Sequence, residues 1–167
     1  DRQRVLDATL AQVLAGEAAA FRPASLLDQD FCPRLRILAL RDPPDLAAFR
    51  RMLSNARAGV SAETAQGEAW QAATARAEAL PEDAQPVFLL LARCALEGAP
   101  CPSDATIARA YGTHSAGRAR RLLGWLEERN AIVTRSERGR RRIALVGLGW
   151  ETTPGDPNGP AEDIAAA

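Results

Sequence analysis

The residues of this chain best suited to chemistry are arginines gathered in its last third. Residues 103–143 hold ten arginines and four acids, a net charge of +6 within a chain whose formal net charge is zero. Residues 1–102 carry −2, from 11 arginines and 13 acids, and residues 144–167 carry −4, from four acids. A guanidinium group can grip a phosphate or a guanine edge through two parallel hydrogen bonds. The clustered charge therefore favours nucleic acid as the partner.

Two helices and a β-hairpin are the elements expected to position these arginines. A short helix is expected after Ser103 and ends at Gly112, and a longer one is expected over about 115–129. The longer helix would bury four apolar residues that recur at helical spacing, namely Ala119, Leu122, Leu123 and Leu126. Two β-branched and basic runs then flank a glycine-containing turn at 136–139, which is the pattern of a hairpin.

A helix, a glycine turn, a longer helix and a basic hairpin, in this order, resemble the winged helix-turn-helix of bacterial regulators of the MarR and GntR type. The resemblance covers about residues 88–146, and Ala108 stands four positions before Gly112, where those families carry a small residue. This chain departs from the pattern by one extra residue between Gly112 and the apolar face of the longer helix. The matching segments are Thr106–Gly112, Arg118–Asn130 and Ile132-Val133.

The resemblance implies that the longer helix reads the major groove with its N-terminal half, while the hairpin contacts phosphates or the minor groove. If about five phosphates are neutralised, log affinity should fall against log salt with a slope of roughly −4 to −5. The residues expected to contact DNA are Ser103, Thr113, His114, Ser115, Gly117, Arg118, Arg120, Arg121, Arg138, Arg140, Arg141 and Arg142.

The remainder of the chain indicates helices separated by proline and glycine. Pro33 is expected to separate two short segments, and Asp42 to cap a helix that carries Phe49. An Ala-rich helix is then expected between Ser61 and Pro81. The predicted fold class is mainly α: an N-terminal helical region followed by a winged helix-turn-helix with a small β-hairpin wing. The expected domains are 1–81 for dimerisation or partner docking, 82–147 for the winged helix, and 148–167 as an acidic, flexible tail.

Other chemistry has weaker support in the sequence. Zinc ligands are commonly Cys and His, but no CxxC or HxxxH spacing joins Cys32, Cys94, Cys101 and His114, so no metal or other cofactor is expected. The motifs GxSxG, P-loop and HExxH are all missing from the sequence, which predicts that the protein is not an enzyme.

Composition predicts a globular protein of the cytoplasm. The 167 residues are 47% hydrophobic and 25% charged, which is ordinary for a folded domain. No apolar run approaches the roughly 18 residues needed to cross a bilayer, so no membrane partner is expected. Three cysteines do not make a disulfide framework, which favours a reducing compartment.

Two functions follow from these expectations. The first is a DNA-binding protein of bacterial transcription or replication control, whose partners are double-stranded DNA and a second copy or another protein bound by the N-terminal helices. The alternative is a winged helix that docks a protein partner, such as polymerase or another regulator, and does not bind DNA. The acidic segment 150–164 would then be a partner peptide or a shield over the arginines.

Overall fold

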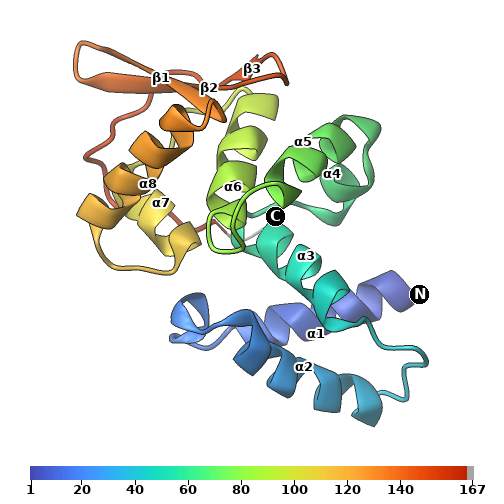
Figure 1. Ribbon diagram of the computed structural model, residues 1–167. Coiled ribbons are helices and arrows are strands. Elements are labelled where there is room, and N and C mark those ends of the chain that lie inside the picture. The colour runs from blue at the N-terminus through green and yellow to red at the C-terminus, as the bar shows by residue number, and fades with distance from the viewer. Residues whose placement is uncertain (165–167) are drawn as a thin grey trace. The chain divides into compact units, whose positions relative to one another are not determined.

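The computed structural model describes residues 1–164 and is mainly helical, with one small antiparallel sheet near the C-terminal end (Figure 1). The chain divides into two compact units, one formed by residues 1–54 and the other by the residues from 55 onward. This division differs from the expected boundary at residue 81. Trp70, Ala73 and Ala77, which precede that boundary, are buried in the core of the second unit.

The first unit contains α1 (Arg2–Leu14), a 3-10 turn (Ala19–Phe21), α2 (Ala24–Ile37) and most of α3 (Leu46–Arg57). Its core is built from apolar residues of all three helices, and α1 packs against α2. The largest of these residues are Leu6, Leu10, Leu27, Phe31, Leu35 and Phe49.

Two expectations for this unit are wrong. Pro33 lies inside α2 and does not separate two segments. Its neighbours Phe31 and Leu35 are both fully buried, and their packing outweighs the hydrogen bond that a helical proline loses. The residue that caps α3 is Asp45, whose Oδ1 accepts a hydrogen bond from the Ala48 amide at 2.8 Å, whereas Asp42 lies in the preceding loop with a positive φ.

The second unit begins with α4 (Ala62–Gln66), α5 (Glu68–Glu78) and α6 (Gln85–Leu96). Ser61 caps α4 as predicted, because its Oγ accepts from the Thr64 amide at 3.2 Å. The Ala-rich run is broken at Gly67, whose extended backbone ends α4 and begins α5. Helix α6 is buried nearly all round and forms the centre of the core.

The two helices that follow agree with the sequence. Helix α7 (Asp104–Tyr111) ends at Gly112, which has a left-handed φ of 85°. Helix α8 (Ala116–Glu128) begins at Ser115, whose Oγ accepts from the Arg118 amide at 3.1 Å. Its buried stripe is the expected one: Ala119, Leu122, Leu123 and Leu126.

The sheet has the order β1-β2-β3, with β1 (Ile132–Glu137), β2 (Arg140–Leu145) and β3 (Trp150–Glu151) all antiparallel. Arg138 and Gly139 join β1 to β2 and both have a positive φ, which is the geometry of a two-residue type I′ turn. The strand β3 was not predicted. Its Trp150 ring stacks near the buried Trp70 ring, with 6.5 Å between centroids.

Residues 148–164, most of the expected flexible tail, are packed as part of this unit, and the last three residues of that tail, 165–167, lie outside the described residues. Beyond β3, Thr153 bridges to Pro100 and Gly155 bridges to Arg141. The Asp104 amide then donates to the Pro157 carbonyl at 2.9 Å. These contacts use backbone atoms, which the acidic, Gly- and Pro-rich composition does not reveal. Within residues 1–164, no helix has the length and hydropathy needed to span a membrane.

Candidate nucleic-acid interface

Cationic groups converge at the N-terminus of α8. Arg118, Arg120 and Arg121 are all exposed. A Cβ added at Gly117 would lie 3.6 Å from a guanidinium nitrogen of Arg121 and 3.8 Å from one of Arg120, so both groups lie over the space left by this glycine. The unpaired amides and dipole at a helix N-terminus also attract anions. The first turn of α8 therefore presents several positive groups together.

The connection before α8 contributes the other predicted contacts of this region. Thr113 Oγ1 accepts from the Ser115 amide at 3.1 Å, which orders the turn, and His114 is exposed at its tip. The Arg118 guanidinium lies 5.7 Å from the centroid of the Tyr111 ring, within cation–π range. The stretch 113–118 thus holds all of its expected contact residues at or near the surface.

The hairpin divides its arginines between two faces. Residues on a strand alternate, so the register places Arg135, Arg140 and Arg142 on the outer face. Glu151 of β3 forms ion pairs with Arg135 and, at 3.4 Å, with Arg142. The hydrogen bond from Arg135 is the main cause that lowers the pKa of Glu151. Within residues 1–164, no ion pair involves Arg138 or Arg140 at the hairpin tip.

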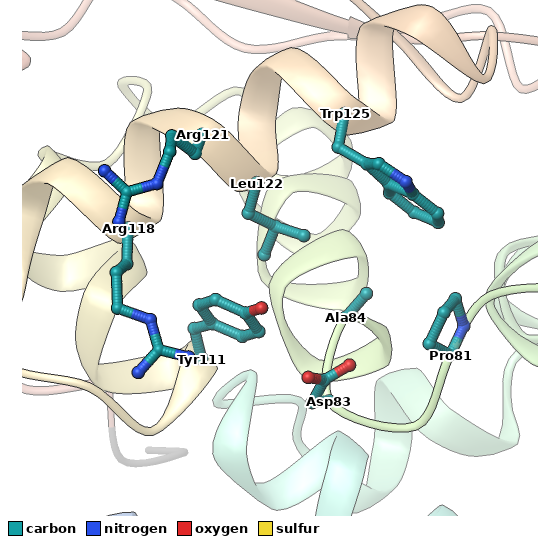
Figure 2. Close-up of a pocket in the computed structure, with 8 residues that line it drawn as sticks. All are labelled: Pro81, Asp83, Ala84, Tyr111, Arg118, Arg121, Leu122 and Trp125. Atoms are coloured by element: carbon teal, nitrogen blue, oxygen red, sulfur yellow. The ribbon is translucent and has the colours of Figure 1, made fainter.

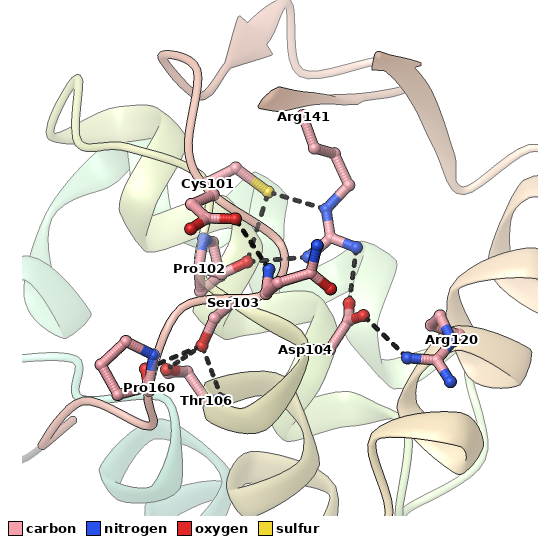
Figure 3. A network of polar contacts seen from close by, with 10 residues as sticks. Cys101, Pro102, Ser103, Asp104, Thr106, Arg120, Arg141 and Pro160 are labelled. Carbon is pink, nitrogen blue, oxygen red and sulfur yellow. Dashed lines mark hydrogen bonds and ion pairs between the residues drawn. The ribbon is translucent and has the colours of Figure 1, made fainter. Parts of the chain in front are cut away.

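Arg141 does not belong to the outer face, so the structure does not place it with the other arginines that the sequence assigns to DNA. It alternates with the buried Ile143 and Leu145, so its side chain enters the interior and is 8% exposed. Its guanidinium pairs with the Asp104 carboxylate at 2.6 Å and donates to the Pro102 carbonyl at 2.8 Å (Figure 3).

Ser103 is likewise structural. Its Oγ accepts from the Thr106 amide at 3.1 Å, which caps α7, and donates to the Pro160 carbonyl at 3.0 Å (Figure 3). The residue is buried under the C-terminal segment, because the Glu162 amide also donates to Thr106 Oγ1 at 3.0 Å. Ser103 therefore marks a helix start, as expected, but one that this segment covers.

Asp104 joins the three elements of the site. One carboxylate oxygen binds Arg141 of β2, and the other binds Arg120 of α8 at 3.2 Å. Its own side chain is 6% exposed, whereas that of Arg120 is 60% exposed. Sequence reasoning missed Asp104 and Glu151. A signal was present for Asp104, since a carboxylate directly after a Ser cap is placed to interact at a helix N-terminus.

The cysteines lie in different surroundings. Burial raises the pKa of the Cys94 thiol to about 11. Burial also raises the pKa of Cys101, although the nearby Arg141, which donates to its Sγ at 3.4 Å, opposes this effect. In the part of the chain that the structure describes, His, Cys, Asp and Glu do not gather in groups of three that could hold a metal ion.

Comparison of the chain with protein-family models, with curated proteins and with solved structures found no significant match.

Proposed function

We propose that the second unit is a winged helix-turn-helix that binds double-stranded DNA. In this proposal α7 and α8 form the helix-turn-helix around the left-handed Gly112, α8 is the recognition helix, and the hairpin of β1 and β2 is the wing. The observation that carries the proposal is the bridging carboxylate of Asp104. Because it binds Arg120 of α8 and Arg141 of β2, it ties the recognition helix to the wing.

The proposed contact surface is smaller than the sequence indicates. Ser103 and Arg141 are buried and are left out. The remaining proposed contacts form one set on α8 and its preceding turn and a second set on the wing. The first would enter the major groove, which is wide enough for one helix, and contact the groove and the inner backbone phosphates, and the second would bind the flanking phosphates. The proposed contacts are Thr113, His114, Ser115, Gly117, Arg118, Arg120, Arg121, Arg138, Arg140 and Arg142.

The wider role that we propose is control of bacterial transcription or replication, without catalysis. One recognition helix reads one half-site, and such proteins commonly pair half-sites about one turn of DNA apart. The helices of residues 1–54 are proposed to bring a second copy into place. Leu26, Ile37 and Leu38 are large apolar side chains exposed on this unit, which supports an interacting role for it.

The test is fluorescence anisotropy with labelled duplexes, first of mixed sequence and then of selected genomic fragments, titrated over a range of KCl concentrations. If Arg118, Arg121, Arg138 and Arg140 each neutralise one phosphate, log affinity should fall against log salt with a slope of about −3.6. A slope near zero, or the absence of binding at low salt, would contradict the proposal.

A further inference from the structure

A pocket of about 300 Å³ lies on the side of α8 within the second unit (Figure 2). Tyr111 and Arg118 lie at one end, Trp125 and Pro81 at the other, and Leu122 and Ala84 between them. Asp83 and Arg121 complete the lining. The pocket therefore joins the loop before α6 to the end of α7 and the flank of α8.

The pocket combines an apolar interior with a cationic rim. Its walls are the aromatic rings of Tyr111 and Trp125 and the aliphatic Leu122. The charged residues in its lining are two arginines, Arg118 and Arg121, and one acid, Asp83, so the lining carries a net positive charge. Outside the pocket, the Arg129 guanidinium lies 4.7 Å from the Trp125 ring centroid and adds positive charge nearby. The complementary occupant has an apolar group and a net negative charge.

We propose that this pocket docks an acidic peptide segment of a protein partner, with one aromatic or leucine side chain inserted between Tyr111 and Trp125. The pocket is at the small end of ligand cavities and open to solvent, so it fits one large side chain better than it encloses a whole small molecule. Aromatic residues and arginines are also the types that dominate binding energy at protein interfaces. Acidic groups beside the anchor would pair with Arg118 and Arg121.

Docking of such a peptide would compete with DNA. This part of the inference rests on the proposed function, because Arg118 and Arg121 belong to both surfaces. A peptide carboxylate that pairs with Arg121 removes that guanidinium from the first turn of α8. The partner would thus release the protein from DNA without a conformational change.

The test uses the whole chain and a fluorescein-labelled peptide, Asp-Glu-Asp-Phe-Glu-Asp-Leu-Leu, followed by anisotropy. A control peptide carries Ala in place of Phe and both Leu and keeps the same charge. The labelled peptide should bind, and the control should bind at least roughly tenfold more weakly. Equal binding of both peptides, or binding of neither, would overturn the proposal.

Matched variants separate the two surfaces. Trp125→Ala should weaken the peptide roughly tenfold and leave DNA binding unchanged, whereas Arg138→Gln should weaken DNA only, and Arg121→Gln should weaken both. Asp83→Asn should tighten peptide binding several-fold, because it removes a like charge. Weaker peptide binding by Arg138→Gln with no loss for Trp125→Ala would mean that only charge is recognised, and would reject the pocket.

Two further measurements distinguish failure of the docking proposal from misfolding of a variant and from failure of DNA binding. In ¹H–¹⁵N spectra of the wild type, the peptide should shift Tyr111, Leu122 and the Trp125 indole, and unchanged signals there would contradict docking even if a variant fails to fold. Unlabelled peptide should also displace labelled duplex. If no duplex binds at all, the proposed function fails while the peptide result stands, and if peptide binds without displacing bound duplex, the competition is wrong.

Discussion

The Arg141 guanidinium and the Asp104 carboxylate form a buried ion pair at 2.6 Å, although the neighbouring Arg140 and Arg142 are exposed. The pair connects β2 of the hairpin to the first turn of α7. The backbone of the C-terminal segment runs beside it, since the Arg141 amide donates to the Gly155 carbonyl at 2.8 Å. Arg120 uses the second carboxylate oxygen. Arg141 therefore helps to position the cationic surface proposed to bind DNA, although its own side chain is buried and is not part of that surface.

Replacing Asp104 should test the stability that this pair provides. Asp104→Asn leaves the Arg141 charge buried without its counterion, and breaking a buried pair in this way costs about 3 to 5 kcal/mol of unfolding free energy. Urea denaturation followed by circular dichroism measures the loss. Arg120→Gln is the control, because that arginine is largely exposed and should cost less than about 1 kcal/mol. Equal losses for the two variants would contradict the bridging role.

Replacing exposed arginines one at a time with glutamine should show which of them contribute to DNA affinity. Arg121→Gln and Arg138→Gln should each weaken binding and reduce the magnitude of the salt slope by about 1, since each removes one phosphate contact. Anisotropy across a KCl series measures both quantities. Arg4→Gln, which removes an exposed arginine of the first unit, should leave the slope unchanged. A loss as large for Arg4→Gln would show that only total charge matters.

Glu151→Gln should strengthen the proposed DNA binding, because Glu151 pairs with Arg135 and Arg142 on the outer face of the hairpin. The arginines lower the pKa of Glu151, so it is ionised at neutral pH. The stability that the pairing provides is present above the ordinary glutamate pKa and is lost as the pH falls through the lowered value, below 4.5. Anisotropy at pH 7 compares the variant with the wild type, and weaker binding by the variant would refute the shielding role.

Two glycine substitutions should change stability in opposite directions. A Cβ at Gly155 would overlap the Cys101 carbonyl, so Gly155→Ala should destabilise the second unit by about 1 to 3 kcal/mol. Gly124 lies inside α8 with nothing near its missing Cβ, so Gly124→Ala should stabilise by about 0.5 to 1 kcal/mol. Thermal unfolding measures both changes. A neutral Gly155→Ala would show that the C-terminal segment is not held where we describe it.

The three thiols should react in a fixed order. Cys94 and Cys101 are buried, and burial raises the pKa of Cys94 to about 11, whereas Cys32 is half-buried. Iodoacetamide at pH 8 should therefore label Cys32 first, as measured by mass spectrometry of peptides. Labelling in urea should reach all three sites. Labelling of Cys101 before Cys32 in the folded protein would contradict the covering of Cys101.

Local signals in the sequence predicted much of the second unit correctly. Gly112, Ser115 and the stripe through Leu122 and Leu126 are fixed by backbone conformation and helical spacing, which neighbouring residues determine. The burial of Arg141 could also have been inferred, because Ile143 and Leu145 alternate with it. What the sequence could not reveal is long-range pairing through main-chain atoms.

The contacts of residues 153–162 are an example, because these residues contribute main-chain atoms, which are the same in every residue type. Trp70 is a second example of tertiary packing that the sequence does not reveal, here within the core. It lies before the expected boundary, yet it packs with α6, because an apolar residue does not indicate which of two neighbouring helices will cover it. The assignment of α5 to the second unit follows from that tertiary packing.

The contacts of the C-terminal segment, residues 153–162, affect how the protein folds during its synthesis. Pro100 and Ser103 find their partners at Thr153 and Pro160, and Thr106 finds one at Glu162. These partners are translated about fifty residues later, so the helices around α7 emerge from the ribosome with their caps and edges uncovered. The nascent second unit can therefore complete these contacts only after Glu162 has left the exit tunnel.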